Sequence, residues 1–194
     1  MNYSIDSIRD SLKEKLNAKR FTHVLGVTYV CASLAMKYDV SIEKAMLAGI
    51  LHDAGKAYKR EESVGLCEKW GIEMTSVERS CPELLHAKTS AYIAQNEYGI
   101  EDEDVLNAIL YHTTGRPNMT LLEKIVYIAD YIEPSRPELP RIKEIRKLAF
   151  EDIDIALYMI FENSVTHLKS SDFIVDPRTE ESYKFYKEVI NGRN

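Results

Sequence analysis

Cysteines are few in this chain, and none is placed for a disulfide framework or a thiolate metal site. Cys31, Cys67 and Cys81 are odd in number and form no CxxC pair. Disulfide frameworks and sulfur-based zinc sites need paired, closely spaced cysteines. Any metal in this protein is therefore expected to be held by nitrogen and oxygen atoms.

Long apolar runs are also absent. No stretch approaches the roughly eighteen apolar residues that a membrane span needs. The opening segment MNYSIDSIRDSLKEKL lacks the basic-then-apolar layout of a signal peptide. We therefore expect a cytoplasmic protein with no membrane partner.

An excess of positive charge is absent, because 25 Lys and Arg residues are outnumbered by 31 Asp and Glu residues, and the formal net charge is −6. Binding to nucleic acid is driven by basic surface that meets phosphate, so no nucleic-acid partner is expected. A small phosphorylated ligand is compatible with this charge. It would need local help from a metal or from a few well-placed Lys and Arg.

Strand patterns are missing as well, and helical periodicity dominates the chain. We predict an all-α fold and a single domain over residues 1–194, long enough to bury a core. Residues 60–82 are the least regular part and are predicted as a short helix and a variable, exposed loop. The expected helices cover about 5–16, 22–38, 41–55, 83–98, 101–112, 120–133, 153–169 and 179–191.

The segment AGILHDAGK at residues 48–56 places two titratable side chains at the end of a helix of small residues. We expect this helix to begin at Ser41 and to stop at Gly55, which accepts left-handed backbone angles. Residues such as Gly49 would let other helices approach closely. Thr120 and Glu123 predict a capping box at the start of a later helix.

Other polar groups share helix faces with apolar or small residues, at spacings of three, four and seven. Six of them are expected to point toward one interior: His23, His52, Asp53, His86, His112 and Asp130. His167 has mixed neighbours and is interpreted as a surface or capping residue.

One buried histidine is ordinarily a satisfied core residue, but six such groups together favour a shared site. Two buried carboxylates without Lys or Arg on the same faces need a cation to neutralise them. A set of His nitrogens and Asp oxygens suits iron, manganese or zinc better than magnesium or calcium. The sequence therefore predicts a divalent metal site.

The order H…HD…D, formed by His23, His52 with Asp53, and Asp130, resembles the HD superfamily of metal-dependent phosphohydrolases. The segments RFTHVLGV, LLHAKTSA, ILYHTTGRPNMT and KIVYIADYIEPSR are similar to the YqeK family. Members of that family are bacterial symmetrical bis(5′-nucleosyl)-tetraphosphatases, which split diadenosine tetraphosphate into two ADP. The calcineurin-like motifs GDxHG and GNHE, which serve the same cleavage in another family, are absent.

The resemblance implies a helical bundle of roughly eight to ten helices around a metal centre, most simply an iron centre. It makes His23, His52, Asp53 and Asp130 the metal ligands, with Asp53 also orienting the attacking water. His86 and His112 would line the same cavity. They either complete a second metal site or contact the phosphates, and the sequence does not separate these two roles.

Phosphate charge needs cationic partners, and Lys56, Arg116 and Arg136 are candidates, with surface solvation as the alternative for each. We favour function for Arg136 and assign Lys56 to the catalytic site, whereas Arg20 is expected to pin its helix through an ion pair. Thr113 can donate a hydroxyl to a phosphate. The segment FIVDPRT resembles a family stretch that closes over the nucleotide and adds these substrate-binding candidates: Ile174, Val175, Asp176, Pro177, Arg178 and Thr179.

Two other functions remain open. One is a broader HD phosphohydrolase acting on nucleoside triphosphates, deoxynucleotides or cyclic nucleotides, and the other is a metal-dependent nucleotide-binding module without turnover. The Tyr-rich segment SYKFYKEVI could form a homodimer surface as easily as a core face. The number of metals and the choice between adenine and guanine stay open.

Overall fold

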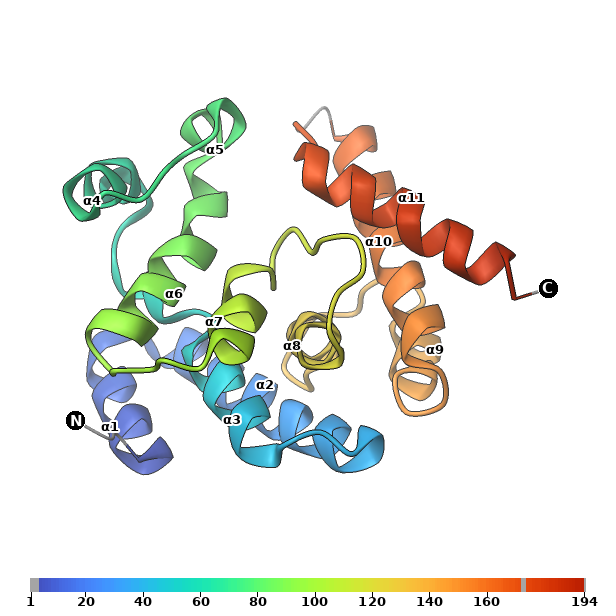
Figure 1. Ribbon diagram of the computed structural model, residues 1–194, viewed down its shortest axis with the longest axis horizontal. Coiled ribbons are helices and arrows are strands. Elements are labelled where there is room, and N and C mark those ends of the chain that lie inside the picture. The colour runs from blue at the N-terminus through green and yellow to red at the C-terminus, as the bar shows by residue number, and fades with distance from the viewer. Residues whose placement is uncertain (1–3, 172–173, 194) are drawn as a thin grey trace.

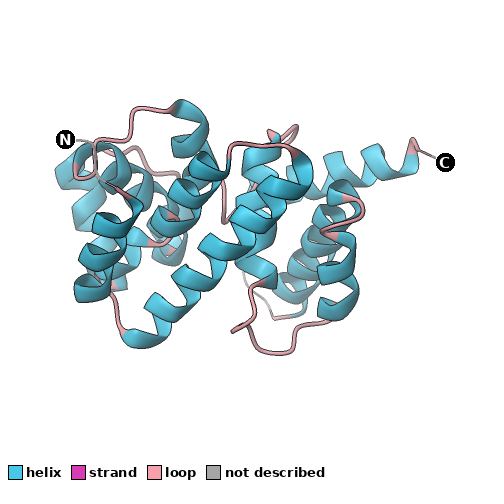
Figure 2. Ribbon diagram, turned by 90° about the horizontal axis from the view of Figure 1, so that it is seen from below, coloured by secondary structure: helices cyan, strands magenta, loops and turns pink. Residues whose placement is uncertain are grey.

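The computed structural model describes residues 4–171 and 174–193. Within these ranges every regular element is a helix, as Figures 1 and 2 show, so the all-α prediction is confirmed. The α-helices are α1 (Ile5–Lys15), α2 (Ala18–Tyr38), α3 (Ile42–Leu51), α4 (Ser63–Trp70), α5 (Ser76–Ser80), α6 (Leu85–Asn96), α7 (Glu103–Leu110), α8 (Leu121–Ile132), α9 (Ile142–Leu148), α10 (Ile153–Ser170) and α11 (Pro177–Asn191). The short 3₁₀ helices are η1 (Ala54–Ala57), η2 (Arg60–Glu62) and η3 (Pro82–Leu84).

Helix α8 lies at the centre of the bundle and packs against α2, α3, α7 and α10. In Figure 1 it is seen nearly end-on, with α2 and α3 below it and α9 to α11 on the red side of the molecule. Its residues Ile125, Val126, Ile128 and Ala129 are fully buried. A helix that is apolar on nearly all sides belongs in a core. The last turn of α8 therefore brings its polar residues into the middle of the protein.

Helices α2 and α3 form the most extensive helix pair in the fold. Gly49 permits their close approach, because a Cβ there would lie 3.0 Å from Thr28 Cα and 3.1 Å from Cys31 Sγ. The predicted role of this small residue is confirmed. Ser41 caps α3 by accepting a hydrogen bond from the Lys44 N–H, as predicted.

The prediction that Gly55 stops the third helix was wrong. Helix α3 ends at Leu51, and the chain continues through His52 and Asp53 into η1, with no positive φ at Gly55. Gly55 is instead a point of close contact with α6. Its N–H donates to Ser90 Oγ at 2.8 Å, and a Cβ would lie 2.7 Å from the His86 carbonyl oxygen.

Residues 60–82 are more regular than predicted, because they contain α4 and α5 as well as η2. Thr75 and Glu78 form a capping box at the start of α5, and Trp70 stacks on Tyr92 of α6 with ring centroids 4.5 Å apart. The stacking attaches α4 to α6, and an ion pair of 2.7 Å between Glu78 and Lys88 attaches α5 to the same helix. Helix α9 was also not expected, whereas the predicted Thr120–Glu123 capping box on α8 is confirmed.

One buried apolar cluster extends from α1 to α11, and the assignment of the whole chain to a single domain stays a prediction. Among the described residues, no helix combines the length and the apolar character needed to cross a membrane.

Candidate metal centre

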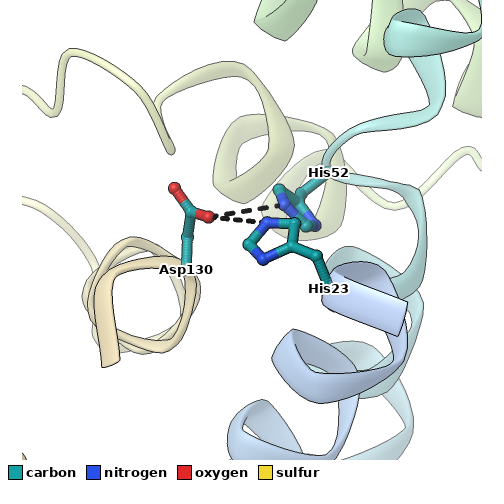
Figure 3. Close-up of side chains that lie close together, drawn as sticks. All are labelled: His23, His52 and Asp130. Carbon is teal, nitrogen blue, oxygen red and sulfur yellow. Dashed lines mark ion pairs between the residues drawn. The ribbon is translucent and has the colours of Figure 1, made fainter. Parts of the chain in front are cut away.

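Three separate helices bring their ends together at a cluster of metal-ligating side chains. His23 lies on α2, His52 follows the last residue of α3, and Asp130 lies in the last turn of α8 (Figure 3). Asp130 Oδ1 is 3.0 Å from His23 Nε2 and 3.7 Å from His52 Nε2. Asp53 and His112 form a second group with His52, again with donor atoms within 4.8 Å of one another. Five of the predicted site residues therefore meet at one place.

The histidine rings are held so that their Nε2 atoms face this cluster. His52 Nδ1 donates to the Gly49 carbonyl at 2.7 Å, and His112 Nδ1 donates to the Ile109 carbonyl at 2.6 Å. A neutral imidazole whose Nδ1 carries the hydrogen has its lone pair on Nε2. The Nε2 atoms of His23 and His52 are buried and have no hydrogen-bond partner among the described residues. Buried polar atoms are rarely left unsatisfied, so this donor set fits a bound cation.

Glu133 orients the His23 ring, a role that the sequence reading missed. Its buried carboxylate accepts from His23 Nδ1 at 2.9 Å and from the Ser135 N–H and hydroxyl at 2.6 Å each. Gly26, one turn after His23, makes room for it, because a Cβ there would lie 2.5 Å from Glu133 Oε2. A carboxylate behind a ligating histidine fixes the ring and raises its basicity. Gly26 was the available sequence signal, since it shares a helix face with His23.

Asp53 joins the two halves of the cluster. Its Oδ2 accepts from Arg20 at 2.6 Å and lies 3.4 Å from His52 Nε2, while its Oδ1 lies 3.5 Å from His86 Nε2. Burial alone would raise the pKa of Asp53, but the surrounding histidines, His52 first, hold that pKa well below its ordinary range. Asp53 is therefore an ionised carboxylate, and the expected ion pair of Arg20 is made with it.

Asp130 is ionised for similar reasons. Burial would raise the pKa of its carboxyl, but the close approach of His23 and the charge of Arg136 lower that pKa below its ordinary value. Arg136 donates through Nε to the Asp130 carbonyl at 2.8 Å and through a terminal N–H to Oδ1 at 2.5 Å. Each of the two ionised carboxylates at this site is therefore paired with one arginine, Asp53 with Arg20 and Asp130 with Arg136.

His86 and His112 face each other across the cluster, with their Nε2 atoms 3.1 Å apart. His86 Nδ1 donates to the Glu83 carbonyl at 2.5 Å, so both rings direct Nε2 lone pairs at one another in their neutral forms. Burial, above all, lowers the pKa of His86 and lowers the pKa of His112 to about 3. The Thr113 hydroxyl lies 3.2 Å from both Nε2 atoms and can donate to only one of them. The two Nε2 atoms are therefore suited to bind a cation or a hydrogen-bond donor.

The cluster opens into a cleft of about 300 Å³. Its basic wall consists of Arg20, Arg136 and Lys56, whose ammonium donates to Glu83 at 2.9 Å. The remaining lining comes from α8, α10, the start of α6 and the segment after α7. The lining residues are Arg20, Asp53, Lys56, Glu83, His86, His112, Thr113, Tyr127, Asp130, Tyr131, Arg136, Ile160 and Ser164.

Comparison with known proteins assigns this arrangement to a family. The model of the HD domain matches residues 20–135, a span that contains His23, the His52–Asp53 pair and Asp130. The chain belongs to the HD domain family. The prediction drawn from the H…HD…D order is therefore confirmed.

Two relatives of this HD domain protein match over nearly their whole length. A Bacillus subtilis protein named symmetrical bis(5′-nucleosyl)-tetraphosphatase is 39% identical over 181 residues, which are 93% of this chain and 95% of the relative. A Halalkalibacterium halodurans protein of the same name is 40% identical over 172 residues, which are 89% of this chain and 91% of the relative. These matches confirm the resemblance to the YqeK branch of the HD family.

A solved structure confirms the HD fold. It is a protein of Clostridium acetobutylicum described as a predicted HD superfamily hydrolase involved in NAD metabolism. It is 41% identical to this chain, superposes with a TM-score of 0.92, and the match covers 97% of this chain and 99% of that chain.

Some predicted residues lie outside the cleft of this HD domain. Arg116 donates to the buried Glu123 at 2.6 and 3.0 Å and stacks over the Tyr111 ring. None of the six residues 174–179 lines the cleft, and Arg178 lies over the same Tyr111 ring, 5.4 Å from its centroid. Phe173, the first residue of FIVDPRT, lies outside the described residues. His167 is exposed on α10, in agreement with its interpretation as a surface residue.

Proposed function

We propose that this HD domain protein hydrolyses diadenosine tetraphosphate symmetrically to two ADP with a metal-activated water. One observation carries the proposal. The orphaned Nε2 atoms of His23 and His52 meet the ionised carboxylates of Asp53 and Asp130, and these carboxylates line a cleft together with two arginines. Relatives that share about two fifths of the sequence over most of the chain carry the name of that activity.

We assign the metal ligands to His23, His52, Asp53 and Asp130. The nitrogen and oxygen donors are compatible with iron, which the YqeK resemblance favours, and also with manganese or zinc. When bound, such an ion polarises phosphoryl oxygens and lowers the pKa of a bound water toward neutrality.

The side chains around the ion then position water and substrate. Asp53 is the carboxylate that we assign to orient the water, because Arg20 holds its Oδ2 while its Oδ1 faces the histidine side of the site. Arg136, Lys56 and Thr113 line the cleft at hydrogen-bonding distance from other site residues and are assigned to phosphate oxygens. In an acidic protein, these local cations supply the attraction that a tetraphosphate needs.

We assign His86 and His112 to a second cation when one is bound, and to the phosphates when one metal is bound. The facing Nε2 lone pairs support the first assignment, because two acceptors 3.1 Å apart repel each other unless a cation or donor lies between them. For residues 174–179, closure over the nucleotide stays a prediction. The same holds for a homodimer, for a cytoplasmic location and for the absence of a nucleic-acid partner.

Product analysis tests the proposed function. The metal-loaded protein is incubated with diadenosine tetraphosphate, and the nucleotides are separated by ion-exchange chromatography. ADP as the sole product supports the proposal, whereas AMP with ATP, or no turnover with any of the three metals, contradicts it. Asp53→Asn should abolish ADP formation. Asp39→Asn is the matched control, because Asp39 is exposed at the end of α2 and its left-handed backbone accommodates asparagine.

The same assay addresses the two other functions. Faster hydrolysis of a nucleoside triphosphate or a cyclic nucleotide than of diadenosine tetraphosphate would favour the broader phosphohydrolase. A binding module without turnover would release no product, and Asp53→Asn would then have no activity to remove.

A further inference from the structure

A second cleft of about 340 Å³ lies beside the first, and two residues line both clefts. Arg20 and Arg136 line both clefts, so they form the partition between them. The outer wall of the second cleft includes Lys19, Ser135 and Pro137. This space lies at the start of α2 and just beyond the end of α8.

The substrate of the proposed function needs two such spaces. A dinucleoside tetraphosphate consists of two equal nucleoside diphosphate halves on either side of the bond that is cleaved. Pockets that enclose one small ligand have volumes of about 300–1,000 Å³. The first cleft, at about 300 Å³, is at the lower end of that range, a size that suits one half of the substrate better than both.

We propose that the second cleft is the subsite for the second nucleoside diphosphate half of the substrate. This inference rests on the proposed function. The polyphosphate chain crosses from one cleft to the other over Arg20 and Arg136. Each half of the symmetrical substrate then lies in a cleft of similar volume, and the central bond lies at the metal cluster.

The two arginines of the partition are suited to a chain of phosphates. Arg136 uses its Nε and one terminal N–H on Asp130, and Arg20 uses one terminal N–H on Asp53. A guanidinium has five N–H donors, so each arginine retains donors for phosphate oxygens. Their side chains are 33% and 32% exposed, and these donors are therefore accessible from the clefts.

The second cleft also contains a lysine that is available to a phosphate group. Its one acidic residue, Glu133, is already bound by His23 and Ser135. Within the part of the chain that the structure describes, Lys19 has no ion-pair partner. A diphosphate group in this cleft therefore meets the Lys19 ammonium together with the remaining N–H donors of Arg20 and Arg136.

The reaction then places one product in each cleft. The oxygen of one water forms a bond to one of the two central phosphorus atoms, and the bond from that phosphorus to the bridging oxygen breaks. The bridging oxygen leaves with the other half. Two ADP and two protons are released to solution for each water consumed.

The binding of ADP to the metal-loaded full chain, measured by equilibrium dialysis, tests this inference. We expect two ADP per chain. Lys19→Glu should remove one of the two and raise the KM for diadenosine tetraphosphate about fivefold or more, with kcat within about twofold. Lys37→Glu is the matched control, because Lys37 is exposed on the same helix, outside both clefts, and the change in charge is identical. It should bind two ADP with unchanged KM.

A wild-type chain that binds one ADP would overturn the inference, and so would a Lys19→Glu variant that behaves like Lys37→Glu. The failure of the proposed function is separate, because it appears as a wild-type protein that forms no ADP from diadenosine tetraphosphate. A protein that forms ADP but binds only one ADP per chain has the proposed function without the second subsite.

Discussion

Replacing Gly26 with alanine should destabilise this protein and weaken its metal site, although the same change stabilises an ordinary helix. Gly26 lies inside α2, where a glycine-to-alanine change normally raises the free energy of unfolding by about 1 kcal/mol. Here the new Cβ would lie 2.5 Å from Glu133 Oε2 and 3.3 Å from its Cδ. Glu133 would have to move away from His23 and Ser135.

The expected size follows from the groups that are displaced. Overpacking a buried site costs about 1–3 kcal/mol, and disrupting a hydrogen bond to a buried charged group costs about 1.5–3 kcal/mol. Against the helix gain of about 1 kcal/mol, the free energy of unfolding should fall by about 1.5–5 kcal/mol. Because His23 loses the acceptor that orients its ring, metal affinity should fall about 10- to 100-fold.

Chemical denaturation of the apo protein and a metal titration measure the two effects. Gly65→Ala is the control, because Gly65 is inside α4 and an added Cβ there would meet nothing within 4 Å. It should be as stable as the wild type or more so, and should bind metal normally. If Gly26→Ala behaves like Gly65→Ala in both measurements, Gly26 does not make room for Glu133 and the orienting role of that carboxylate is refuted.

Two further predictions concern an ion pair between α5 and α6 and the arginine at Asp130. Burial alone would raise the pKa of Glu78, but the hydrogen bond from Lys88, 2.7 Å away, lowers the pKa below its ordinary value. The unfolded state then binds more protons, so this stabilisation is present above about pH 4.5 and lost as pH falls through the lower folded-state pKa. Between pH 7 and pH 3, the free energy of unfolding should fall more steeply for the wild type than for Glu78→Gln. If it falls equally in both proteins, the Glu78–Lys88 pair does not contribute this stability. Arg136→Lys keeps the positive charge, but a lysine cannot donate to both the Asp130 carbonyl and the Asp130 carboxylate in one plane. The kcat/KM for diadenosine tetraphosphate should therefore drop about tenfold. An unchanged kcat/KM would show that the charge alone suffices.

The positions of the metal-cluster residues on the helices could be predicted from the sequence. His23, His52 and Asp130 follow helical faces whose other members are apolar or small, and that periodicity survives in the fold because the same faces are buried. Capping residues such as Ser41 were equally predictable, since their side chains act on backbone groups only three positions away.

Contacts between distant segments could not be predicted in this way. Glu133 contacts His23 across 110 positions, and no local pattern distinguishes it from an ordinary helix-terminal acid. Cleft residues such as Tyr127 and Ile160 have the pattern of core residues, and only the packing of α8 against α10 shows that they border a cleft.

Gly55 and α5 show two other kinds of error. Glycine favours helix ends, and that preference hid the other use of glycine, which is to let a second backbone come close. The capping box at Thr75 and Glu78 was a readable signal for α5. The polar composition of the surrounding segment favours a loop and masks this signal.

The most direct test of the central claim measures metal content and ADP formation in the same preparations. Wild-type protein, His52→Ala and the control His167→Ala are loaded with iron, manganese or zinc, desalted, and assayed by elemental analysis and with diadenosine tetraphosphate. We expect wild type and His167→Ala to retain metal and release ADP alone, because His167 is exposed and outside the cleft. His52→Ala, which removes a fully buried Nε2 donor, should lose both the metal and the activity. A wild-type protein that retains no metal under any loading condition, or a His52→Ala variant that still forms ADP at the wild-type rate, would contradict the account.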